Sequence, residues 1–213
     1  MSDYDRLLEL IRSRRSIRRF TDRAVSREDL VRLLEAARWA PSNHNRQPWH
    51  FLIIEDRQQL HQLAEAVRRD LIAKTKSLPE AAGGYFHEFI DYATFFAEAP
   101  MLVVALHKRP VSLSAAVLAG LRNPELVSGE PLSAAMAVQN LLLAAQALGL
   151  GACVLTGPLL VPEALTRTLA LPPGYDLACL VAVGYPAESP PPPRRKTIEQ
   201  IAEFRNNSGR TET

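Results

Sequence analysis

Four stretches of apolar residues, each followed by turn-forming or polar residues, are the clearest pattern along the chain. They are HFLIIE (50–55), MLVVALH (101–107), GACVLTG (151–157) and ACLVAVGYP (178–186). Short runs of branched apolar residues are typical of strands that are buried on both faces. The pattern therefore predicts strands of a central sheet at these four places.

Two shorter helices are indicated near the start of the chain. Tyr4, Leu7 and Ile11 recur at helical spacing, which predicts an amphipathic first helix. Ser26 has the position of an N-cap for a second helix, LVRLLEAARWA, which ends before Pro41.

Three longer helices are predicted over residues 56–76, 83–96 and 132–149. The last is apolar nearly all round, so it must be covered on all sides, by the core or by a partner subunit. Because helices separate the strands, the layout is α/β or α+β with a central sheet.

Composition and charge narrow the classes of protein. The chain has 213 residues, 47% of them hydrophobic, a mean hydropathy of -0.07 and a net charge of +2. These values favour one globular domain, over residues 1–205, followed by a polar tail over 206–213. The small net charge argues against a nucleic-acid binder, and no apolar run is long enough for a membrane span. With no signal-peptide pattern at the start, we expect a cytoplasmic protein.

Several common catalytic motifs are absent from the sequence. It has no third glycine after GLG (149–151) for a dinucleotide fingerprint, no P-loop and no metal-ligand spacing of histidines or cysteines. Cys153 and Cys179 fall in predicted strands, so we interpret them as buried free thiols.

The strongest candidate chemistry is cationic. Arg14, Arg15, Ser16 and Arg18 form a cluster that is suited to a phosphate, because guanidinium groups bind its oxygens in pairs. The alternative is a charged run that caps the negative end of the first helix. A second cationic group, PRRK (193–196), follows an extended proline run and is either a solvated linker or a second part of the site.

Two loops offer further binding groups. APSNHNRQPW (40–49) is rich in amide and hydroxyl side chains between prolines, which suits a planar ligand, although turn chemistry explains these residues equally well. The strand end VLTGP (154–158) places a glycine where its N–H can approach a ligand closely, or where the chain simply turns.

Taken in order, these motifs resemble the FMN-dependent nitroreductase family. The resemblance runs through RRSIRRF, ARWAPSNHNRQPWHF, QNLLLAAQALGLG, VLTGP and GYPAESPPPPRRKTIEQI, which is nearly the whole chain. It implies an α+β sandwich with a central mixed sheet flanked by helices. It also implies a homodimer whose subunits exchange arms and form two FMN sites at their interface, with the helix 132–149 at its centre.

The resemblance also assigns residues to the flavin. The ribityl-phosphate end would be held by Arg14, Arg15, Ser16 and Arg18, and the phosphate also by Arg194 and Arg195, with or without Lys196. The isoalloxazine ring would be contacted by residues of the other subunit, namely Pro41, Ser42, Asn43, Asn45 and Gln47. Thr156 and Gly157 would lie at the ring edge, with the Gly157 N–H near the flavin N5.

Two positions depart from the family pattern. Some members have Glu where this chain has Thr156, and many have Ser-Ser where it has Ser42-Asn43. Both positions are expected near the reactive ring, so the departures concern the choice of substrate.

The resemblance implies that NADH or NADPH reduces the flavin, which then reduces flat, electron-poor acceptors such as nitroaromatics or quinones. With no dinucleotide fold for a separate donor site, we expect ping-pong kinetics. Other flavin chemistry on this scaffold (reductive dehalogenation or flavin fragmentation) and non-catalytic flavin storage remain alternatives. The candidates for the acceptor pocket are Tyr85, Phe86, Phe89, Tyr92 and the segment 109–130.

Overall fold

The computed structural model describes residues 1–75, 83–109 and 129–205. The predicted tail, 206–213, and nearly all of the segment 109–130 lie outside the described residues. The helices are α1 (Asp3–Ser13), α2 (Arg27–Arg38), η1 (Asn43–Asn45), α3 (Arg57–Thr75), α4 (Gly83–Thr94), η3 (Phe95–Glu98), α6 (Gly129–Ala147), η5 (Gly157–Leu160) and α7 (Pro162–Leu169). The strands are β1 (Trp49–Ile54), β2 (Met101–Lys108), β3 (Gly151–Leu155) and β4 (Tyr175–Gly184).

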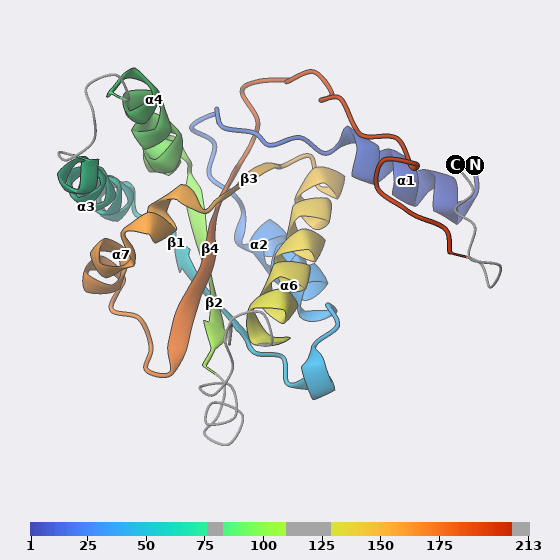
Figure 1. The fold of residues 1–213 in the computed structure, drawn as a ribbon, viewed down its shortest axis with the longest axis horizontal. Coiled ribbons are helices and arrows are strands. Elements are labelled where there is room, and N and C mark those ends of the chain that lie inside the picture. The colour runs from blue at the N-terminus through green and yellow to red at the C-terminus, as the bar shows by residue number, and fades with distance from the viewer. Residues whose placement is uncertain (76–82, 110–128, 206–213) are drawn as a thin grey trace.

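The four predicted strands form one sheet in the order β1-β2-β4-β3, and each neighbouring pair is antiparallel. The α+β class and the central sheet flanked by helices are confirmed (Figure 1). The sheet differs from the predicted mixed one because β2 and β3, which run in the same direction, are separated by β4. Parallel pairing in the part of the chain that the structure describes is limited to an isolated bridge between Ser16 and Ala152.

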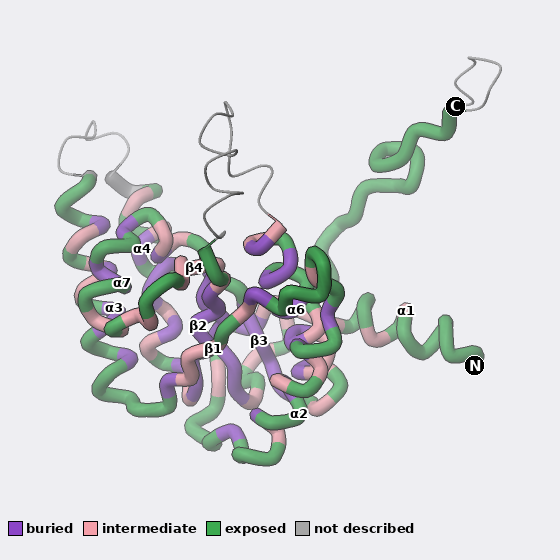
Figure 2. The backbone as a smooth tube through the Cα atoms, turned by 90° about the horizontal axis from the view of Figure 1, so that it is seen from below, coloured by how far each residue is buried: buried purple, intermediate pink, exposed green. Residues whose placement is uncertain are grey.

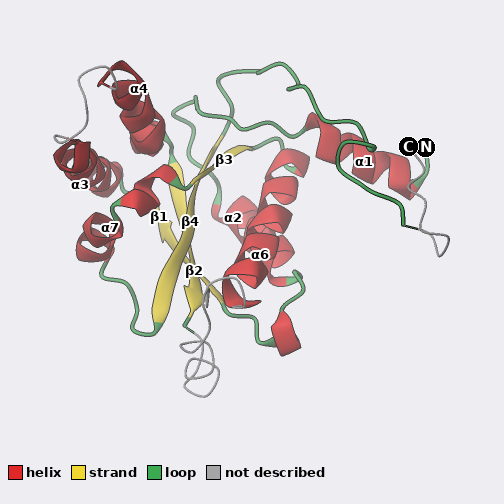
Figure 3. Cartoon of the chain, viewed as in Figure 1, coloured by secondary structure: helices red, strands yellow, loops and turns green. Residues whose placement is uncertain are grey.

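Helices cover both faces of the sheet. α3, α4 and α7 lie on one face, and α2 and α6 lie on the other (Figure 3). β2 is buried from both sides. Leu102 and Val104 lie in the core between the sheet and α3, α4 and α7, and Met101 and Val103 lie in the core between the sheet and α2 and α6. This is why the strand reads as a continuous apolar run, and Figure 2 shows it buried at the centre of the molecule.

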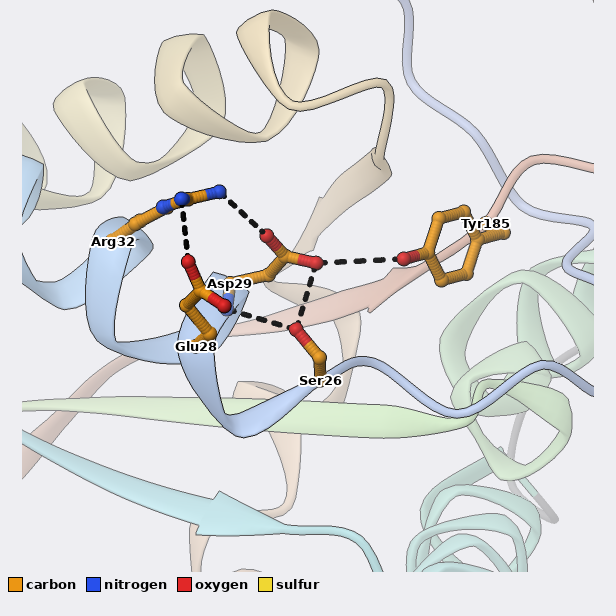
Figure 4. Close-up of polar contacts among 5 residues, drawn as sticks. All are labelled: Ser26, Glu28, Asp29, Arg32 and Tyr185. Atoms are coloured by element: carbon orange, nitrogen blue, oxygen red, sulfur yellow. Dashed lines mark hydrogen bonds and ion pairs between the residues drawn. The ribbon is translucent and has the colours of Figure 1, made fainter.

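The predicted N-cap of α2 is confirmed. The Asp29 N–H donates to Ser26 Oγ at 3.0 Å, and the Ser26 hydroxyl donates to Asp29 Oδ2 at 2.9 Å. The Tyr185 hydroxyl donates to the same carboxylate oxygen at 3.4 Å, and Arg32 pairs with Asp29 and Glu28 (Figure 4). The N-terminus of α2 is thus fastened to the chain that leaves β4.

α6 spans almost the predicted helix, but a single chain does not cover it on all sides. Ala137, Leu141 and Ala145 pack into the core, whereas Leu132 is 63% exposed and Met136 39% exposed on the opposite face. Within the described residues, no helix combines the length and the apolar character that crossing a membrane requires.

Candidate functional site

The cationic segment that contains residues 14–18 lies along β3, the edge strand of the sheet. The Ile17 N–H donates to the Ala152 carbonyl at 3.2 Å, and Ser16 forms a bridge with the same residue. This close approach requires Gly151, because a Cβ atom there would lie 2.7 Å from the Ile17 Cβ. The segment is therefore a fixed extended element rather than a loose charged run.

Arg18, from this segment, and Cys153, from β3, line the same cavity. Burial raises the pKa of Cys153, while the charges of Arg18 and Arg14 and a hydrogen bond with Ser16 lower it. Ile17, between them, is buried on the other side of the segment. In an extended segment alternate residues face the same side, so Arg14, Ser16 and Arg18 lie on the side opposite Ile17. Both cysteines are free and buried, as predicted.

Arg15 has a different place from its neighbours. Its Nη1 donates to the Arg12 carbonyl at 2.6 Å and to the Arg14 carbonyl at 2.8 Å, at the end of α1. The helix-capping alternative thus describes Arg15, although not the other members of the cluster. Its Nε is buried and has no hydrogen-bond acceptor in the described part of the chain.

The predicted strand-end residues meet the cationic segment at a cavity of about 190 Å³. Arg18, Thr156 and Gly157 line it together with Tyr92. The Arg18 guanidinium carbon lies 5.5 Å from the centre of the Tyr92 ring. Gly157 fits closely against α4, since a Cβ atom there would lie 3.1 Å from the Ala93 Cβ.

The structure separates the four aromatic candidates for the pocket wall. Phe89 and Tyr92 line the cavity, whereas Phe86 packs on Phe89 with ring centres 5.6 Å apart and Tyr85 is 84% exposed. Phe95 and Cys153 also line the cavity, and sequence reasoning missed both. The helical spacing of Phe95 three residues after Tyr92 was the available signal.

A second cavity, of about 460 Å³, adjoins the first and shares Arg18, Tyr92 and Phe95 with it. Its other lining residues are mostly charged and are Arg19, Glu88, Asp91 and Glu188. Asp91 is paired with Arg68 at 2.9 Å. No motif singled out Glu88 or Glu188, because an isolated acid in a sequence is usually a solvated surface residue.

The amide-rich loop, residues 41–47, lies at the N-terminal end of α6. Its Asn43 N–H donates to the Ser133 hydroxyl at 3.4 Å, and its Arg46 pairs with Glu130 at 3.5 Å. The Ser42 hydroxyl accepts from the Gln47 N–H at 3.0 Å, so part of this loop does have the expected turn chemistry.

Three residues of the loop have left-handed backbone conformations. The φ angles are 50° at His44, 52° at Asn45 and 46° at Gln47, although none is glycine. Such conformations are unfavourable for side chains with a Cβ atom and gather at functional sites. Asn and His adopt this region more often than other residues with a Cβ atom, so Gln47 is the least usual of the three.

A single chain does not bring this loop to the cavity. The loop lies at the N-terminal end of α6, whereas the start of β3 and the cationic segment beside it lie at the C-terminal end of α6 (Figure 1). The 19 residues of α6 give the helix a length of about 28 Å. The two groups of predicted residues are therefore at opposite ends of the helix.

The C-terminal arm, residues 189–205, carries Arg194 and Arg195 away from the body, and α1 projects in another direction (Figure 2). Both elements expose apolar side chains. On the arm Ile201 is 65% exposed and Phe204 67%, and α1 buries none of its residues. Together with the open face of α6, these residues leave apolar surface uncovered in a single chain.

Comparisons with known proteins agree on one family. The family profile described as Nitroreductase family matches residues 11–185. An iodotyrosine deiodinase of Thermotoga neapolitana is 31% identical over 93% of this chain and 98% of its own length. An NADH dehydrogenase of Thermus thermophilus is 29% identical over 90% of this chain and 92% of its own length.

The fold is also shared with a solved flavoprotein structure. A crystal structure of oxidized iodotyrosine deiodinase bound to FMN and 3-iodo-L-tyrosine superposes with a TM-score of 0.70 at 27% identity. The match covers 90% of this chain and 96% of that one. With the profile match over most of its length, the chain belongs to the nitroreductase family.

Proposed function

We propose that the protein is an FMN-dependent oxidoreductase that uses NADH or NADPH to reduce flat, electron-poor aromatic acceptors. The observation that carries this proposal is that Arg18, from the cationic segment, lines one cavity together with Thr156 and Gly157. The family and the FMN-bound structural relative support the same cofactor. The NADH dehydrogenase among the relatives supports the electron donor.

The donors of the cluster fit a phosphorylated ligand. Among the described residues, neither Arg14 nor Arg18 forms an ion pair with a carboxylate, whereas Arg68 and Arg167 do. Arg15 adds a buried Nε without an acceptor. A buried donor without an acceptor, such as the Arg15 Nε, is costly unless a ligand satisfies it, and a phosphate with its ribityl hydroxyls has acceptors of the right kind.

The complete site requires two chains. Two copies of α6, packed antiparallel through the face that exposes Leu132 and Met136, bring the N-terminal end of one helix beside the C-terminal end of the other. The loop 41–47 of one copy then approaches the cationic segment and Gly157 of its partner. In this arrangement Arg194 and Arg195, carried by the exchanged arm, close the phosphate end of the site.

When bound, FMN supplies the transfer of electrons from the nicotinamide donor to the acceptor. The residues of the chain bind and orient it and exclude water. The guanidinium of Arg18 lines the cavity at the strand end, where its positive charge would bind and orient an anionic group of the cofactor. Tyr92 holds this guanidinium in place and, with Phe89, gives the cavity an aromatic wall.

The visible spectrum of the purified protein tests this function. We expect a yellow protein, or a colourless one that takes up added FMN, and bleaching on anaerobic addition of NADH or NADPH. Turnover with a nitroaromatic or a quinone should follow parallel double-reciprocal lines. A protein that binds no FMN would refute the proposal, and bound FMN that neither donor reduces would favour a storage role.

Reductive dehalogenation is the second candidate, because the iodotyrosine deiodinase relative matches the chain over 98% of its own length. The same flavin site would serve either reaction. Release of halide from a halogenated phenol by the dithionite-reduced protein, with slow turnover of nitroaromatics, would favour this candidate over nitro or quinone reduction.

A further inference from the structure

Glu188 lies at the junction of the sheet, the cationic segment and the C-terminal arm. After β4, residues 185–188 run antiparallel to residues 18–21, with hydrogen bonds from the Thr21 N–H to the Tyr185 carbonyl and from the Ala187 N–H to the Arg19 carbonyl, both 2.9 Å. Glu188 is the next residue, and the exposed proline run begins two residues later. It is thus the last contact before the arm leaves the body.

One carboxylate oxygen of Glu188 holds two successive backbone N–H groups. Its Oε1 accepts from Arg18 N at 2.6 Å and from Arg19 N at 3.2 Å. In the described part of the chain these two N–H groups have no other hydrogen-bond acceptor. The carboxylate therefore replaces the carbonyl acceptor that a neighbouring strand would provide.

The carboxylate binds the backbone of Arg18 and not its guanidinium, whose Nη1 donates to the Ser16 carbonyl at 3.4 Å. No ion pair joins Glu188 to the Arg18 side chain in the described residues, and that side chain lies over Tyr92 in the cavity wall. Fixing the Arg18 backbone fixes the point from which its guanidinium reaches the cavity. The charge remains available for an anionic ligand.

We propose that Glu188 is a positioning residue for the cofactor site, an inference that rests on the proposed function. It holds the Arg18 backbone on one side and the start of the arm that carries Arg194 and Arg195 on the other. A single acceptor thereby fixes the Arg18 backbone and the point at which the arm begins. The effect depends on hydrogen-bond acceptance, so an amide oxygen at the same position should largely replace it.

The test compares FMN dissociation constants of the full-length protein, measured by quenching of FMN fluorescence on titration with apoprotein. For Glu188→Ala we expect the constant to rise about tenfold or more, because two charge-assisted hydrogen bonds are lost. For Glu188→Gln we expect a rise within about threefold, since the amide oxygen still accepts a hydrogen bond. The matched control is Glu88→Ala, which removes the same charge from the same cavity.

The outcomes are distinct. Equal FMN affinity of Glu188→Ala and the wild-type protein overturns the positioning role. Equal weakening by Glu188→Gln, or by Glu88→Ala, shows that charge rather than hydrogen bonding acts, and also overturns it. A wild-type protein that binds no FMN overturns the proposed function together with this inference. Unfolding midpoints of the apoproteins measure the stability that the lost hydrogen bonds contributed, and the FMN affinities are compared under conditions in which every variant is folded.

Discussion

The exposed face of α6 gives the sharpest test of a site built from two chains. We expect Leu132→Glu to separate the dimer and to remove FMN binding together with it. Leu132 is 63% exposed in one chain and lies on the same face as Met136. A glutamate in the first turns of a helix is favourable for the isolated helix, so the monomer should still fold.

The expected rise in the dimer dissociation constant follows from the apolar area that Leu132 would bury. Full burial of a leucine side chain is worth about 2 kcal/mol, so covering the exposed 63% of Leu132 contributes about 1.3 kcal/mol per copy. A symmetric dimer contains two copies, which gives about 2.5 kcal/mol, or roughly a 70-fold rise in the dimer dissociation constant. Burying two carboxylates adds a desolvation cost to this loss.

The assay is sedimentation velocity over a range of concentrations, combined with the flavin content of each species. The matched control is Tyr85→Glu, which introduces the same charge at a residue that is 84% exposed on the opposite face of the sheet. The control should stay dimeric and yellow. A Leu132→Glu monomer that retains FMN with wild-type affinity would refute the argument that the loop 41–47 of the partner completes the site.

Three further outcomes can be checked. Arg18→Ala should raise the FMN dissociation constant about 5- to 150-fold in a fluorescence titration, the range of 1–3 kcal/mol for a charged hydrogen bond, and Arg15→Ala should raise it less because Arg15 caps α1. Gly151→Val should displace the segment that contains Ile17 and weaken FMN binding, with unfolding in urea as the measure of any general damage. Burial raises the pKa of Cys179 from 9.0 to about 11, so the unfolded chain loses this proton first as the pH rises. Stability in urea should therefore fall between pH 9 and 11, and Cys179→Ala should reduce the fall; an unchanged slope would contradict the assignment.

The sequence was most informative where one local pattern decides the structure. β2 and β4 were predictable because strands buried on both faces must be apolar throughout, and Ser26 was predictable because a cap depends on a few adjacent residues. The antiparallel order of the sheet could not be predicted from the sequence. It depends on β4 lying between β2 and β3, and no local pattern records which strands become neighbours.

The same limit applies to the site. Arg14, Ser16 and Arg18 lie on one side because an extended segment places alternate residues there, which the sequence permits but does not require. Arg15 belongs to the same cationic segment, yet its guanidinium donates to the carbonyls at the end of α1. Glu188 was missed because its contact with Arg18 joins residues that lie 170 positions apart.

The separation of the predicted site residues is itself an argument about assembly. A single chain places arginines without carboxylate partners at one end of α6 and a loop with three left-handed residues at the other. The proposed function assigns both groups to one cofactor, which they cannot contact together within one chain. In the proposed dimer, an antiparallel pair of α6 helices would join the two ends in space and at the same time cover Leu132 and Met136. Burial of the apolar face and completion of the site would then depend on a single contact, so loss of the dimer and loss of the cofactor should occur together.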